Sequence, residues 1–200
     1  EVFIGHKEVE HPLCLQLGGC TPERVGEAAA LCEAYNGHFQ SINLNCGCPS
    51  NKAKRAGFGA ELMLDPINTG RIVKEMIRRV THTEVTVKCR LGVLPDHDSY
   101  EELQKFIGEV TQAGARTIIL HARNVVLQGL SPAQNRSIPP LKYDVVHQLV
   151  KEWPDVNFVL NGGLHNFDEV EKHLGWGDGN DEEYPVVGCM IGREAYRNPW

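Results

Sequence analysis

Short apolar runs recur along the chain and are separated by segments whose apolar residues repeat at helical spacing. The runs are almost continuously apolar and do not alternate with polar residues, as is typical of parallel strands buried on both faces. They predict six strands: Pro12–Leu17, Gln40–Asn45, Glu84–Cys89, Arg116–His121, Asn157–Asn161 and Val186–Ile191.

Helix-start signals lie between the predicted strands. Three of them combine a capping residue with a proline or with acidic residues in the first turn: Thr21-Pro22-Glu23, Asp65-Pro66, and Asp98-Ser99 with Glu101 and Glu102. The second signal starts a segment with one apolar face, made up of Ile72, Val73, Met76, Ile77 and Val80. Strands that alternate with helices, without a run of hairpins, predict a parallel α/β sheet.

Two parallel architectures compete, an open doubly wound sheet and a (β/α)8 barrel of TIM type. The segment Leu17–Cys20 after the first predicted strand does not supply the glycine pattern of a dinucleotide-binding turn. Polar residues instead follow almost every strand, which favours the barrel because its active site is assembled from many strand ends. These residues are Gln16, Asn43, Asn45, Lys88, Arg90, His121, Arg123, Asn161 and Arg193.

Glycines after the last two predicted strands indicate which part of a barrel is present. Barrels often bind phosphate between the loops after strands seven and eight, where glycines let backbone N–H groups approach the anion. Asn161-Gly162-Gly163 and Gly192-Arg193 would be these loops, although an ordinary glycine turn is the alternative. We therefore expect residues 1–200 to form a single domain, a (β/α)8 barrel truncated at the N-terminus with strands three to eight present.

Composition sets further limits. A chain of 200 residues with 42% hydrophobic content can bury one sizeable core. It has no run long enough to span a membrane, and its first seven residues lack the basic, apolar and small-residue regions of a signal peptide. No second cysteine pair joins Cys46 and Cys48, so no metal site is expected. The odd number of cysteines favours reduced thiols in the cytoplasm or an organelle interior rather than a secreted protein. Most lie within apolar segments: Cys14, Cys32, Cys89 and Cys189.

The charge is unevenly distributed. The net charge of -6 argues against a generic nucleic-acid binder, which would normally be basic. Residues 51–90, however, contain nine Lys/Arg against four Asp/Glu. This basic segment could contact phosphate groups, or it could be a solvated helix face.

Cys48 lies just past a predicted strand, in the turn Gly47-Cys48-Pro49. A thiol at a strand end can act as a nucleophile, as a general acid or base, or remain an inert, partly buried group. No Cys-His-Asn series of the protease type accompanies it, which favours acid–base chemistry.

Two neighbouring strand ends present cationic or polar donors. Lys88 and Arg90 are two residues apart and so point to the same side, and His121 and Arg123 repeat the arrangement on the next predicted strand. Such donors could stabilise an anionic or electron-rich ligand, and a flavin fits well. Solvated surface charges are the alternative.

Several motifs together resemble those of the tRNA-dihydrouridine synthases, in the family's order and over essentially the whole chain. They are Ile42–Ser50 (INLNCGCPS), Phe58–Met63, Val87–Arg90, His121–Arg123, Asn161–Gly163 and Met190–Arg193. The segment Gly129–Leu141 is similar to the subfamily that modifies positions 20 and 20a of the tRNA D-loop.

The resemblance implies a flavoenzyme that uses NADPH and FMN to reduce uridine to 5,6-dihydrouridine, with the tRNA D-arm as partner and no membrane partner. Hydride would pass from reduced FMN to C6 of a uracil flipped out of its stack, and Cys48 would protonate C5 from the opposite face. The resemblance assigns the flavin ring to Gln16, Lys88 and His121. It assigns the FMN phosphate to Asn161, Gly162, Gly163, Gly192 and Arg193. Asn45, Arg90 and Arg123 would face the substrate.

The resemblance also indicates what to expect outside these motifs. The loop Asn124–Leu141 would line the mouth that faces the tRNA. The family's first two strands and its C-terminal helical tRNA-binding domain are expected to be absent, and the acidic insert Gly175–Glu183 is a surface elaboration to which we assign no function. Three alternatives stay open: an FMN barrel of dihydroorotate-dehydrogenase type, a structural or RNA-contacting module without catalysis, and a phosphate-binding barrel enzyme without flavin.

Overall fold

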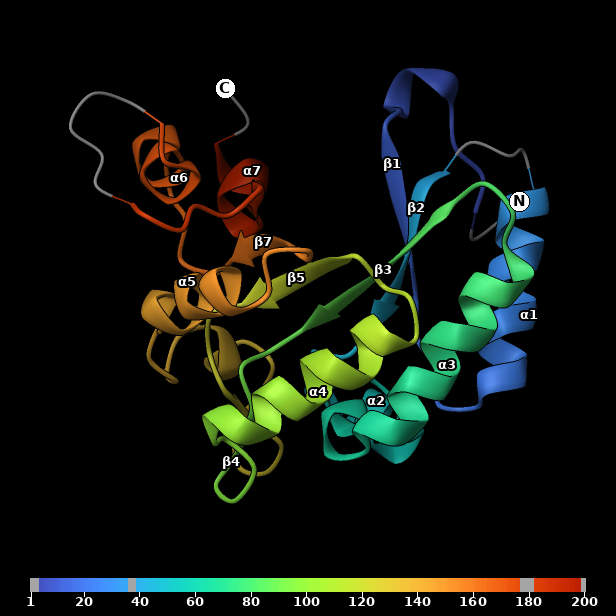
Figure 1. Ribbon diagram of the computed structural model, residues 1–200, viewed down its shortest axis with the longest axis horizontal. Helices are drawn as coiled ribbons and strands as arrows, with labels where there is room; N and C mark the ends of the chain where they lie inside the picture. The colour runs from blue at the N-terminus through green and yellow to red at the C-terminus, as the bar shows by residue number, and fades with distance from the viewer. Residues whose placement is uncertain (1–3, 36–38, 177–181, 199–200) are drawn as a thin grey trace.

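In the computed structural model, which describes residues 4–35, 39–176 and 182–198, six parallel strands form one sheet. They lie side by side in the order in which they occur in the chain (Figure 1). These strands are β1 (Leu13–Leu17), β2 (Phe39–Asn45), β3 (Glu84–Cys89), β5 (Thr117–His121), β7 (Asn157–Asn161) and β8 (Gly188–Met190). A doubly wound sheet reverses its strand order at a switch point, so this sequential order makes a half-barrel and excludes the doubly wound alternative.

Helices connect the consecutive strands, and α1, α3 and α4 pack side by side along one face of the sheet (Figure 1). The helices are α1 (Pro22–Ala34), α2 (Asn51–Arg55), α3 (Pro66–Arg79), α4 (Tyr100–Gln112), α5 (Tyr143–Glu152), α6 (Phe167–Leu174) and α7 (Arg193–Arg197). Shorter elements complete the described part of the chain: the 3-10 turns η1 (Glu8–Glu10), η2 (Gly59–Leu64) and η3 (Gln134–Arg136), and the paired strands β4 (Val93–Leu94) and β6 (Val125–Val126).

The predicted strands and helix starts are confirmed. All six strands are present, with ends within two residues of the prediction. Ser99 caps α4 in a capping box with Glu102, and the Asp65 side chain accepts a hydrogen bond of 3.1 Å from the backbone N–H of Asn68 at the start of α3. The predicted apolar face of α3 is buried at Ile72, Val73 and Met76.

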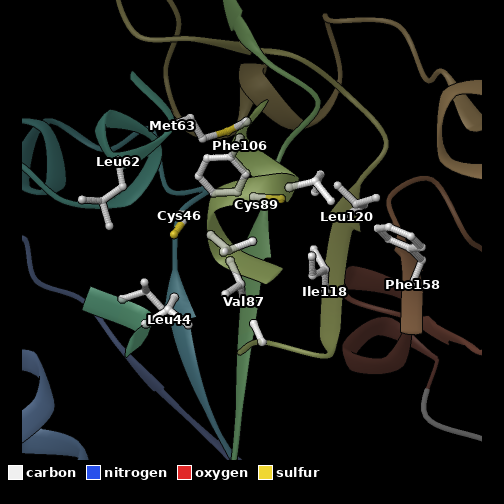
Figure 2. Close-up of a cluster of buried hydrophobic side chains, with 14 of the residues drawn as sticks. Leu44, Cys46, Leu62, Met63, Val87, Cys89, Phe106, Ile118, Leu120 and Phe158 are labelled. Carbon is white, nitrogen blue, oxygen red and sulfur yellow. The ribbon is translucent and has the colours of Figure 1, made fainter. Parts of the chain in front are cut away.

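The apolar core lies between the helices and one face of the sheet. Figure 2 shows side chains of β2, β3, β5 and β7 in one cluster with Phe106 of α4 and Leu62 and Met63 of η2. Burying a side chain of this size stabilises the fold by about 1.5–3 kcal/mol. The strand residues labelled there are Leu44, Val87, Cys89, Ile118, Leu120 and Phe158, and Cys46 follows β2 directly.

The prediction that the strands are buried on both faces is confirmed for the central strands β2 and β5, where residues 41–44 and 118–121 are buried, and is wrong for β1. Along β1, half-buried leucines alternate with the exposed residues Cys14 and Gln16, because this second face borders a cavity. Cys14 is therefore exposed and Cys189 half-buried, although both were predicted to be buried. The seven cysteines all lie in described segments, and none forms a disulfide.

Further features concern the described residues only. None of their helices is long and apolar enough to cross a membrane, and they contain no group of three or more His, Cys, Asp or Glu side chains that could hold a metal ion. Within the predicted insert Gly175–Glu183, residues 177–181 lie outside the described residues. Gly175 ends α6 with a left-handed φ of 69°, a conformation that favours glycine.

Candidate active site

A cavity of about 560 Å³ lies on the inner face of the half-barrel, at the carboxyl ends of the strands. Its volume is in the range of small-molecule and cofactor sites. It brings together eleven of the twelve predicted site residues: Gln16, Asn45, Cys48, Lys88, Arg90, His121, Asn161, Gly162, Gly163, Gly192 and Arg193.

Strand register places polar side chains of β1, β2 and β3 side by side on the inner face. Gln16 pairs with Asn43, and Asn43 pairs with Thr86. The Gln16 amide donates to Asn43 Oδ1 (2.8 Å), and the Asn43 amide donates to Thr86 Oγ1 (2.8 Å). Asn43 was not predicted as a site residue, although it lies two residues before Asn45 on one strand, so that both side chains point to the same face of the sheet.

The turn that contains Cys48 is shaped by Asn45. Asn45 Oδ1 accepts hydrogen bonds from the backbone N–H groups of Gly47 and Cys48, both at 3.1 Å, and its amide donates to Gln16 Oε1 at 3.0 Å. Ser50 caps α2 and also accepts from Cys48 Sγ at 3.3 Å. The Cys48 thiol is consequently fixed at the cavity wall, where it is half-buried.

The two cysteines of the C-x-C pair have different surroundings. Cys46 is fully buried and points into the apolar cluster (Figure 2). Burial, together with the nearby Cys89 thiol, raises the pKa of Cys46 well above its usual range. Cys48 is therefore the cysteine of this pair that can exchange a proton with a ligand in the cavity.

Lys88 and His121 form the middle of the cavity wall. Lys88 Nζ donates to Asn161 Oδ1 at 2.9 Å, and the Asn161 amide donates to the carbonyl of Met190 at 2.8 Å. Burial lowers the pKa of Lys88 to about 8, and the charge of Arg90 adds to this effect. Burial and the same cations lower the pKa of His121 to about 2, so its imidazole is neutral at physiological pH.

Arg90 connects two loops at the edge of the cavity. Its side chain is almost fully buried, and burial lowers its pKa to about 10, which still leaves it protonated at neutral pH. Nε donates to the carbonyl of Gly47 (3.2 Å), while Nη1 donates to the carbonyls of Asn135 (2.8 Å) and Asn124 (3.3 Å). Nη2 makes no hydrogen bond to any described residue, so this nitrogen is available to a ligand.

The glycine turn after β7 packs closely against the segment that leads into α5. Gly163 has a φ of 75°, and a Cβ there would lie 2.5 Å from a Leu141 methyl carbon and 2.7 Å from Tyr143 Oη. Tyr143 Oη also donates to the carbonyl of Gly162 at 2.7 Å. Packing therefore requires glycine at position 163. A Cβ at Gly192 would meet nothing within 4 Å, so the cavity is open beside β8.

Arginines gather at this open end of the cavity. Arg193, Arg136 and Arg197 all line it, and Arg193 Nη2 donates to the carbonyl of Arg136 at 3.4 Å. Arg136 and Arg197 were not predicted as site residues. The spacing of four residues between Arg193 and Arg197 places both on one side of a helix and could have identified Arg197. Several guanidinium groups beside a glycine turn suit an anionic group such as a phosphate.

Arg123 is the predicted site residue that does not line the cavity. Its Nη1 donates to the carbonyls of Ser137 (3.4 Å) and Pro139, and its buried Nε has no hydrogen-bond partner in the described part of the chain. Arg123 thus lies at the base of the loop Asn124–Leu141. That loop reaches the cavity through Pro132 and Arg136.

Comparisons with known proteins agree on one family. A family model described as "Dihydrouridine synthase (Dus)" matches residues 3–200. Proteins named tRNA-dihydrouridine(20/20a) synthase from Pseudomonas putida and Xanthomonas axonopodis are each 44% identical over 99% of this chain, which covers 55% of their length. The one from Shewanella oneidensis is 41% identical with the same coverage. The chain therefore spans about half the length of the curated relatives it matches.

Proposed function

Because the chain belongs to the dihydrouridine synthase family, we propose that its cavity is part of an active site that reduces uridine to 5,6-dihydrouridine in the D-loop of tRNA. FMN would be the cofactor and NADPH the reductant. The observation that carries this proposal is the position of the Cys48 thiol on the same cavity wall as Lys88, His121 and Asn161.

The residues of the cavity fit FMN. Arg193 would bind the phosphate as a guanidinium donor, together with Asn161, Gly162, Gly163 and Gly192. Gln16 and Lys88 would hold the isoalloxazine ring, with Lys88 as the positive charge and the neutral imidazole of His121 as a hydrogen-bonding partner. When bound, FMN supplies the hydride that adds to C6 of the uracil.

Cys48 would donate the proton to C5 from the face opposite the hydride. Ser50 and the Asn45 side chain fix the Cys48 turn, so the thiol is held in place before the substrate arrives. Arg90 would contact the uracil through Nη2. The flipped nucleotide would enter past the loop Asn124–Leu141. Arg123, just before this loop, donates hydrogen bonds to carbonyls within it.

We further infer that residues 1–200 form a single domain, in which the six strands are strands three to eight of a (β/α)8 barrel. The glycine turns after β7 and β8 support this assignment because barrels often bind phosphate there. In this proposal, the first two strands and a helical tRNA-binding domain would belong to the part of the relatives' length that these 200 residues do not span.

Replacing the proposed acid tests the function. In the intact protein, Cys48→Ala should retain bound flavin and NADPH oxidation but form dihydrouridine in tRNA at least about 100-fold more slowly, since positioned proton transfer contributes that much or more. Cys20→Ala is the matched control, because Cys20 lies outside the cavity and its thiol donates to the carbonyl of Ala56.

Two results would contradict the proposal. Normal dihydrouridine formation by Cys48→Ala would remove Cys48 as the acid. A wild-type protein that binds flavin and oxidises dihydroorotate, but leaves tRNA unchanged, would support the alternative FMN barrel instead.

A further inference from the structure

Asn135 organises the loop Asn124–Leu141 from within. The residue is fully buried, and its side-chain amide pairs with both backbone groups of Val126. Asn135 Oδ1 accepts from the Val126 N–H at 2.8 Å, and Nδ2 donates to the Val126 carbonyl at 2.9 Å. Longer bonds from Nδ2 reach the carbonyls of Leu130 (3.4 Å) and Ser131 (3.3 Å). One side chain therefore connects backbone groups from both ends of the loop segment 126–131.

The turn that Asn135 fixes supplies acceptors to two arginines of the cavity. The carbonyl of Asn135 itself accepts from Arg90 Nη1 at 2.8 Å, and the next carbonyl, that of Arg136, accepts from Arg193 Nη2 at 3.4 Å. Arg90 follows β3 and Arg193 follows β8. Two consecutive carbonyls of η3 thus hold cations that come from different strands of the sheet.

Arg90 extends this connection to the Cys48 turn. Its Nε donates to the carbonyl of Gly47, the residue before Cys48, and its charge interacts with the Cys48 thiol. A displaced Asn135 carbonyl would leave the Arg90 guanidinium without its shortest acceptor in a buried site. Because a buried charge needs compensating partners, Arg90 would shift, and the Gly47 carbonyl would lose its donor.

We propose that Asn135 is a positioning residue, which acts through Arg90 on the Cys48 turn and through the carbonyl of Arg136 on Arg193. Its role in dihydrouridine formation rests on the function proposed above. The structural connection from Asn135 to Cys48 does not, so the two can be tested separately.

The test measures the alkylation of Cys48 by iodoacetamide as a function of pH, with peptide mass mapping to separate Cys48 from the other cysteines. In the intact protein, Asn135→Leu keeps the number and branching of the side-chain heavy atoms but removes the amide. We expect Cys48 to be alkylated at least about threefold faster across the profile, because the half-buried thiol becomes more accessible once the Gly47 carbonyl loses its Arg90 donor and the Cys48 turn loosens. FMN should bind about two- to tenfold more weakly, because Arg193 loses one hydrogen-bond acceptor. Dihydrouridine formation at saturating FMN should be at least tenfold slower.

Variants of other residues separate positioning from general destabilisation. Gln128→Ala changes an exposed side chain of the same loop and should leave all three measurements unchanged. Arg90→Lys should by itself speed up the alkylation of Cys48, because the smaller set of donors cannot hold the Gly47 carbonyl and the loop carbonyls together. Adding Asn135→Leu to it should produce little further change, because interacting residues are not additive in a double-mutant cycle. If Asn135→Leu does not fold, Asn135→Ser, which leaves room for a water molecule, should show a smaller effect in the same direction.

An unchanged Cys48 profile in a folded Asn135 variant, or additive effects in the cycle, would overturn the proposal. A wild-type protein that shows the expected faster alkylation on mutation but forms no dihydrouridine would contradict the proposed function and leave the positioning role intact.

Discussion

The protonated side chain of Lys88 lowers the stability of the folded protein. Its pKa falls from 10.5 to about 8, mainly through burial. Protonation is therefore less favourable in the folded chain than in the unfolded one. The penalty is fully present below pH 8 and disappears as the pH rises from about 8 to 10.5. An anionic or electron-rich ligand in the cavity would offset it.

We expect Lys88→Met to raise the melting temperature of the ligand-free protein at pH 7 while it weakens FMN binding. Removing the buried charge should stabilise the fold by about 1–2 kcal/mol, or several degrees in a chain of this size. Lys74→Met, at an exposed position of α3, is the control and should change neither property. Calorimetry and flavin titration measure the two effects, and a melting temperature below that of the wild type would contradict the prediction.

The residues of the cavity differ in how far the sequence predicts them. Lys88, His121 and Asn161 were predictable because parallel strands end at one edge and alternate residues share a face. Arg136 was not, because its place depends on the pairing of Asn135 with Val126, nine residues away in a loop without any period. Arg123 precedes the same loop, and its contacts with loop carbonyls could not be read from its spacing to His121.

At the scale of the elements, one carboxylate joins α1 to the turn before β3. Glu33 accepts from the backbone N–H groups of Thr81, His82 and Thr83, each at 2.8 Å, and from Thr81 Oγ1 at 2.9 Å. Partial burial acts to raise the pKa of Glu33, but these hydrogen bonds outweigh it and lower the pKa from 4.5 to about 2. The ionised carboxylate therefore stabilises the fold above about pH 4.5, and this contribution is lost as the pH falls toward 2.

Glu33→Gln should lower the free energy of unfolding at pH 7 by about 1–3 kcal/mol, because the amide cannot accept all four hydrogen bonds and carries no charge. The difference from the wild type should shrink as the pH is lowered from 5 to about 2, because the wild-type carboxylate becomes protonated as the pH approaches its pKa of about 2. Glu84→Gln, at the exposed first residue of β3, is the matched control. Urea unfolding at several pH values measures this, and a pH-independent difference would show that the carboxylate charge is not the cause.

The elements themselves were predictable to different degrees. The apolar residues of long helices and buried strands recur with a clear period. The capping residues Asp65 and Ser99 mark the starts of the helices α3 and α4. The strands β4 and β6 contain two residues each, which is too short for any period. They exist because Val93 and Leu94 pair with Val125 and Val126, a contact between two loops that local sequence does not specify.

At the scale of the whole molecule, the sheet order follows from the alternation of strands and helices, but the character of its two faces does not. Continuous apolar runs suggested burial on both sides, whereas the inner face contains a polar network around a cavity. The net charge of -6 likewise does not predict the local charge at the open end of the cavity, which is lined by Arg136, Arg193 and Arg197. This contrast between overall and local charge leads to a test on the whole chain.

FMN should raise the melting temperature of the protein more than riboflavin, which has the same ring but no phosphate. Free ligand at 100 times its dissociation constant stabilises a fold by about 2.7 kcal/mol, or roughly 5–10 °C for a chain of this length. Arg193→Met should bring the shift with FMN closer to that with riboflavin and leave the riboflavin shift unchanged. Arg116→Met, at an exposed position just before β5 and so at the opposite end of the sheet, should alter neither shift. The difference between the ligands should also fall with added salt, because salt screens the attraction between phosphate and guanidinium.

Equal shifts with both ligands would exclude the proposed phosphate contact, and no shift with either would exclude flavin binding by this cavity.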